Sequence, residues 1–183
     1  DGTLENGKLD AAIVVDRFEL SAISTLLKSY IVQFTAGTAA GTVAVYGALT
    51  APDFVGALRV SGGEVRSPMS PDAATDVSTF VSFGPGEANE EEKVFVLDSV
   101  TAPMGKGRIS AAARFTMDHW VPNAFELKLT AEPPEGVRIV WRFGTLAVDG
   151  YARGTVRIVN DGMRTEVTSS DLMVQSSRLT LDF

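Results

Sequence analysis

The strongest constraint on this chain is the stretch 125–132, in which apolar and polar residues alternate without exception. Its order is Phe-Glu-Leu-Lys-Leu-Thr-Ala-Glu. A period of two residues is the side-chain period of a β-strand that has one buried and one solvent-exposed face. The sequence therefore predicts a strand here. The functional question is what its apolar face contacts: another layer of protein, or a ligand.

Comparable segments recur along the whole chain and are separated by residues that favour turns. The segments expected to form strands are 9–20, 31–36, 41–49, 54–60 with 64–66, 77–83, 94–102, 107–117, 125–132, 137–148, 151–159, 163–168 and 172–183. The turns expected between them include residues 51–53, 132–136, Asp149-Gly150 and Asp161-Gly162, and Pro103 is expected to end a strand. This pattern predicts a single all-β module over 1–183, built largely from antiparallel neighbours.

One short segment has helical rather than strand periodicity. Ser21 is a suitable N-cap residue, and the apolar residues after it recur at helical spacing, at Ile23, Leu26, Leu27 and Tyr30. We therefore expect one short amphipathic helix within 21–30, placed against an end of the sheet.

Composition and motifs exclude several classes of function. The net charge of −7 disfavours nucleic acid, and no apolar run is long enough for a membrane-spanning helix. The chain has no cysteine and a single histidine, His119, so we expect no transition-metal site and no cofactor. His119 follows Asp118, but neighbouring strand residues point to opposite faces and no nucleophile motif accompanies them. We expect no enzymatic activity.

Two segments carry a resemblance to a known family. The first is Phe-Glu-Leu-Ser-Ala-Ile-Ser-Thr-Leu-Leu at 18–27, a strand that leads into an apolar helix. The second is 41–63, where two glycine-started strands flank an Ala-Pro-Asp turn and end in Gly-Gly. The pattern from 122–129 to 154–158 adds to these. Together they resemble the TamB family (translocation and assembly module), part of the AsmA-like group of bridge-like envelope proteins.

The resemblance implies a fold, a location and partners. The fold would be an elongated, curled, antiparallel-rich sheet that forms an open apolar trough. The chain would be a periplasmic fragment of a longer protein that is anchored in the inner membrane. That protein would conduct phospholipid towards the outer membrane, meet an Omp85-type outer-membrane barrel protein and support outer-membrane protein assembly. The fragment itself would not span a membrane.

Such a trough would shield acyl chains from water, at about 0.8 kcal/mol for each methylene group. The residues expected to line it are Val43, Val45, Leu49, Leu58, Val60, Ile109, Phe115, Met117, Phe125, Leu127, Leu129, Ile139, Trp141 and Phe143. Two alternatives remain open. The same residues suit the sealed core of a structural or adhesive β-sandwich domain of a surface protein. A carbohydrate-binding or glycosidase β-sandwich is a third reading.

Overall fold

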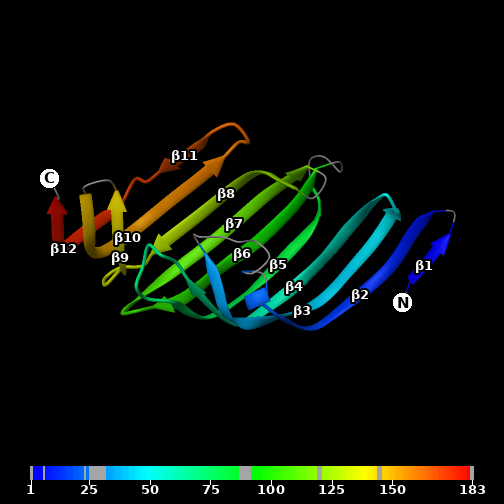
Figure 1. Cartoon of the computed structure of the whole chain (residues 1–183), viewed down its shortest axis with the longest axis horizontal. Coiled ribbons are helices and arrows are strands. Elements are labelled where there is room, and N and C mark those ends of the chain that lie inside the picture. Colours follow the sequence, from blue (N-terminus) through cyan, green and yellow to red (C-terminus); the bar gives the residue numbers. More distant parts are fainter. Residues whose placement is uncertain are drawn as a thin grey trace.

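The computed structural model describes residues 2–5, 7–22, 24, 32–86, 92–118, 121–143 and 146–181. These residues form one twelve-stranded antiparallel sheet, and the sheet is open, because its first and last strands do not pair with each other (Figure 1). The expected all-β, antiparallel architecture is confirmed. The short helix expected within 21–30 falls mainly on residues outside the described ranges.

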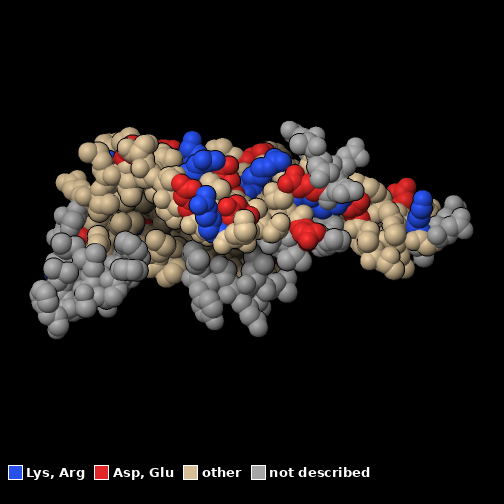
Figure 2. All heavy atoms as spheres, turned by 90° about the horizontal axis from the view of Figure 1, so that it is seen from above, with Lys and Arg blue, Asp and Glu red and all other residues tan. Residues whose placement is uncertain are grey.

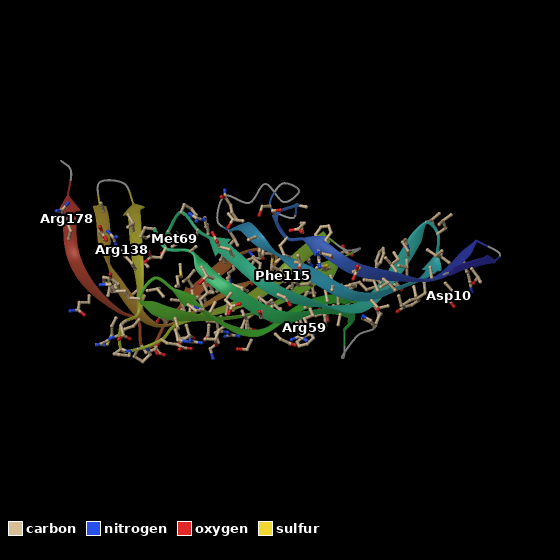
Figure 3. The ribbon with its side chains drawn as sticks, turned by 90° about the horizontal axis from the view of Figure 1, so that it is seen from below. Asp10, Arg59, Met69, Phe115, Arg138 and Arg178 are labelled. Carbon is tan, nitrogen blue, oxygen red and sulfur yellow. The ribbon has the colours of Figure 1, made fainter. Side chains whose placement is uncertain are left out.

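The strands follow one another along the chain in nearly the same order as they lie in the sheet. They are β1 (Gly2–Glu5), β2 (Lys8–Glu19), β3 (Gln33–Ala48), β4 (Ala51–Arg66), β5 (Ala74–Pro85), β6 (Lys93–Met104), β7 (Gly107–Asp118), β8 (Val121–Ala131), β9 (Val137–Phe143), β10 (Leu146–Asn160), β11 (Thr165–Thr168) and β12 (Met173–Leu181). From β1 to β8 each strand pairs with the next. The sheet is curved, and its two ends stand on the same side in Figure 3.

Strand β10 departs from this order because it has two neighbours on each edge. Its first half pairs with β9 and β12, and its second half pairs with β8 and β11. Gly154 lies at the change of partners with a φ of 114°, a conformation that L side chains rarely adopt. A Cβ atom at Gly154 would also collide with the carbonyl oxygen of Asp171. Glycine therefore allows one strand to serve both sets of neighbours.

The two Asp-Gly pairs have different structures. Asp161-Gly162 forms the expected turn between β10 and β11, in which the Asp161 carboxylate accepts the backbone N–H groups of Met163 and Arg164, each at 2.9 Å. The turn expected at Asp149-Gly150 is wrong, because β10 continues through both residues. The register with β12 shifts there instead. Segment 137–148, expected as one strand, contains β9 and the start of β10, and residues 144–145 between them lie outside the described ranges.

Two prolines lie inside strands where turns or strand ends were expected. β4 begins at Ala51 and includes Pro52, and β6 continues through Pro103. The registers pair Pro52 with Gly47 of β3 and Pro103 with Arg108 of β7, and they assign Pro103 no partner in β5. A strand accepts proline, which has no N–H, where no neighbour needs that donor. The segments 31–36 and 41–49, expected as separate strands, are joined within β3.

The described strands form a single layer. The strands in substantial contact with one another are hydrogen-bonded neighbours, and the contact between β7 and β9 is slight. No second sheet covers either face within the described part of the chain. Among those same residues, no helix has the length and apolar character needed to cross a membrane.

Candidate functional site

The strand registers place most of the large apolar side chains on one face of the sheet, which we call the apolar face, although a few such as Tyr46 and Phe80 lie on the other. Residues that are direct partners across an antiparallel pair project to the same side. One such row crosses six strands, through Val81, Leu97, Ala113, Leu127, Ile158 and Val167. Of the residues that these registers place on the apolar face, Lys93 at the start of β6 is the one that carries a charge. The face is therefore almost free of charge, and the uncharged polar side chains on it include Thr79 and Asn160.

Most of the residues expected to line a trough lie on this face. The registers bring together Val43 and Val45 of β3, Leu58 and Val60 of β4, Ile109, Phe115 and Met117 of β7, Phe125, Leu127 and Leu129 of β8, and Ile139 of β9. Leu49 differs: it lies in the turn between β3 and β4 and is 60% exposed. Trp141 and Phe143 belong to β9, but their side chains are outside the described set.

On the apolar face, the small side chains are more completely buried than the large ones. The most buried residues are mostly alanine and valine, whereas Phe115, Phe125 and Leu127 are only partly buried. None of the larger side chains that the structure describes has an exposed fraction below 2%. A closed core buries its largest apolar side chains most completely. Among the residues that the structure describes, no layer of protein therefore covers the apolar face as the second sheet of a sandwich would.

The opposite face of the sheet is polar and carries ion pairs between strands. Arg157 Nε of β10 donates to Glu126 Oε1 of β8 at 2.7 Å, and this hydrogen bond lowers the pKa of Glu126 and raises that of Arg157. Arg138 and Asp149 form a similar pair. Charged side chains gather towards one side of the molecule in Figure 2, and Figure 3 shows Phe115 and Arg59 on opposite sides of the ribbon. The two faces thus differ sharply in chemistry.

The loop between β4 and β5, residues 67–73, crosses one end of the sheet and docks on β9. The backbone N–H of Val140 donates to the carbonyl oxygen of Met69 at 2.9 Å, and the Ser70 hydroxyl donates to the carbonyl oxygen of Arg138 at 2.7 Å. Met69 and Arg138 lie close together in Figure 3. We call this loop the strap. It protects the free edge of β9 from pairing with other chains.

Near the strap, the apolar face is well buried. A cluster of buried side chains gathers there from four strands: Ala74, Val77, Val100, Ala102, Met104, Ala131 and Val137. A smaller cluster lies elsewhere on the face, formed by Leu20, Ala39 and Val60. These two clusters form the buried core of the fold. The larger, half-exposed side chains of the apolar face are therefore available to contact another molecule.

The largest side chains of the apolar face that the sequence reasoning missed include Phe83 and Phe95. They are direct partners of each other, and Phe95 is the partner of Phe115. Segments 77–83 and 94–102 were expected to be strands, but no face was assigned to them. The alternation of Val81 with Phe83 and of Phe95 with Leu97 was the signal that could have found them.

Within the described ranges, no group of histidine, cysteine, aspartate or glutamate side chains could hold a metal ion, and no buried side-chain nitrogen or oxygen lacks a hydrogen-bond partner. No protein-family model matches the chain, and no curated protein or solved structure is significantly similar to it. The resemblance to the TamB family therefore stays a prediction.

Proposed function

We propose that this chain is a non-enzymatic lipid-binding module whose apolar face forms an open trough for phospholipid acyl chains. One observation carries the proposal: a continuous apolar face, with large side chains only partly buried, lies on a sheet with no second layer among the described residues. Each methylene group removed from water contributes about 0.8 kcal/mol. Acyl chains would therefore bind such a face without any specific polar contact.

The size of the face favours conduction over storage of one lipid. The main path of the sheet contains ten strands. At about 4.8 Å between neighbours the face extends for about 43 Å across them. One acyl chain spans about half of the ~30 Å hydrocarbon core of a bilayer. The face is therefore nearly three acyl chains long, and a lipid can shift along it while its tails stay out of water.

The family resemblance supplies the biological setting of the proposal. In that setting the chain is a periplasmic section of a protein anchored in the inner membrane, and it passes phospholipid towards an Omp85-type outer-membrane barrel protein. This route also supports outer-membrane biogenesis and protein assembly. The competing reading, a structural or adhesive domain, requires another protein layer to cover the same face.

Photo-crosslinking tests the proposal directly. A photoreactive residue is placed in turn at Phe125, Leu127, Glu126 and Lys128, which alternate between the two faces of β8. The protein is mixed with phospholipid vesicles, irradiated and examined by mass spectrometry. We expect lipid adducts at the first two positions and not at the second two. Equal labelling of both faces, or no adduct at any position, would count against the trough and favour the structural reading.

A further inference from the structure

Four phenylalanines form a ladder across the apolar face, close to one end of strands β5 to β8. Phe83, Phe95, Phe115 and Phe125 are direct partners on the adjacent strands β5, β6, β7 and β8. The ring centroids of Phe95 and Phe115 are 5.7 Å apart at an interplanar angle of 72°, and those of Phe115 and Phe125 are 5.8 Å apart at 36°. These are the tilted and edge-to-face geometries that aromatic pairs prefer. We call these four residues the phenylalanine ladder.

The ladder lies between two different borders. On one side, the next residues along the strands on the same face include Lys93 and Met117, and the Lys93 ammonium pairs with Asp53 at 2.7 Å. On the other side, the face leads towards Val100 and Ala102, which belong to the buried cluster near the strap. The ladder is therefore a strip with a polar border on one side and closed packing on the other.

All four rings remain partly exposed. Phenylalanine carries a large apolar surface, about 150–250 Å² in each side chain. A sheet that needed these rings only for its own stability would bury them under a second layer, and no such layer covers them within the described residues. The row of rings thus offers a continuous apolar surface that runs across the strands.

We propose that the phenylalanine ladder is the acyl-chain binding site of the trough, where one extended chain lies along the four rings, across the strands. This inference rests on the proposed function and assigns it a location. Three strand spacings of about 4.8 Å make the ladder about 14 Å long. One acyl chain spans about 15 Å, half of the ~30 Å hydrocarbon core. The lengths match, and the absence of polar side chains from the ladder suits a hydrocarbon ligand.

The test compares lipid labelling at positions in the phenylalanine ladder with labelling at positions outside it. A photoreactive phenylalanine analogue is placed at Phe95 or Phe115 in the ladder. The matched positions are Leu129, which is half-buried on the same face but outside the ladder, and Arg114, which is on the polar face. Each protein is irradiated with vesicles of phosphatidylethanolamine and phosphatidylglycerol, and the lipid adducts are quantified by mass spectrometry.

We expect adducts at the two ladder positions several-fold above those at Leu129, and none above background at Arg114. Equal adducts at Leu129 and at the ladder would overturn the ladder as the site while leaving the proposed function intact. The absence of adducts at all three apolar-face positions would overturn both.

A pair of variants gives an independent measurement. The double variant Phe95→Leu and Phe115→Leu keeps the face apolar but removes two rings. Phe80→Leu is its control, because Phe80 lies on the polar face beneath the Arg59 guanidinium and is 51% exposed. With folding checked by circular dichroism, we expect vesicle lipid binding to fall several-fold in the double variant and to stay unchanged in the control. Unchanged binding in the double variant would contradict the proposal.

Discussion

Replacing Leu127 with arginine tests whether the apolar face is open to solvent. Leu127 is half-buried, and its direct partners are Ala113 of β7 and Ile158 of β10. On an open face, an arginine at this position keeps its guanidinium in water while its stem covers the neighbouring residues. The cost is then only part of the ~1.5–3 kcal/mol that full burial of leucine contributes, and we expect about 1–2 kcal/mol.

The matched control is Ala113→Arg in the same row of the apolar face. Ala113 is only 7% exposed, so an arginine there must displace packed neighbours or bury its charge. We expect a loss of more than about 3 kcal/mol, a large share of the roughly 5–15 kcal/mol by which an ordinary domain is stable.

Urea unfolding followed by circular dichroism separates these cases. With a dependence on urea of about 2 kcal/mol per molar, Leu127→Arg is expected to lower the midpoint by about 0.5–1 M and to leave the transition cooperative. If Leu127→Arg instead abolishes the folded state as Ala113→Arg does, then the face is sealed in solution and the trough is wrong.

Three further changes test other parts of the structure. Ser70→Ala removes the strap's hydrogen bond to the Arg138 carbonyl oxygen, and we expect a loss of about 0.5–1.5 kcal/mol together with faster amide hydrogen exchange in β9. Gly154→Ala places a Cβ against backbone at a φ of 114°, so we expect a loss of more than about 1 kcal/mol in urea unfolding. The hydrogen bond from Arg157 lowers the pKa of Glu126, so the contribution of this pair to stability is complete above the ordinary value of 4.5 and is lost as the pH falls through the lowered pKa. Glu126→Gln should reduce this acid sensitivity.

For each of these three variants, one result would contradict the expected outcome. Unchanged hydrogen exchange in β9 of Ser70→Ala would show that the strap does not depend on that hydroxyl. Gly7→Ala is the control for Gly154→Ala, because Gly7 also has a positive φ but nothing within 4 Å of a Cβ. Equal losses of stability in Gly7→Ala and Gly154→Ala would mean that the positive φ alone sets the cost. The collision of the new Cβ atom with neighbouring backbone at residue 154 would then contribute nothing. An identical pH profile for Glu126→Gln would show that other carboxylates set the acid sensitivity.

The sequence predicted the strands well because each apolar face imposes an alternation that can be read locally. The stretch 125–132 is the clearest case: Phe125, Leu127 and Leu129 are half-buried on β8, and Glu126 and Lys128 are exposed. Alternation alone does not indicate whether a face is covered, so the sequence left the open trough and the sealed sandwich as alternatives. The arrangement of strands in one layer is a long-range property that no local pattern encodes.

The errors arose where a local turn signal competed with partners from elsewhere in the sheet. Asp149-Gly150 has the residues of a hairpin turn, yet Asp149 pairs with Arg138 on β9 and the chain continues as a strand. Pro103 lacks an N–H, but the registers give it no partner in β5 that would need one. The docking of the strap on β9 likewise depends on residues far apart in the chain, so no local pattern predicted it.

The order of the strands determines how the stability of this sheet is distributed among them. From β2 to β7 each strand pairs with its immediate predecessor and successor in the chain. Stability is then close to a sum of nearest-neighbour terms, as in linear arrays of repeats. Opening is expected to begin at an end and to proceed strand by strand, without collapse of a shared centre. The distance that the apolar face covers is set by the number of strands, so one more hairpin of the same pattern would lengthen it without disturbing the rest.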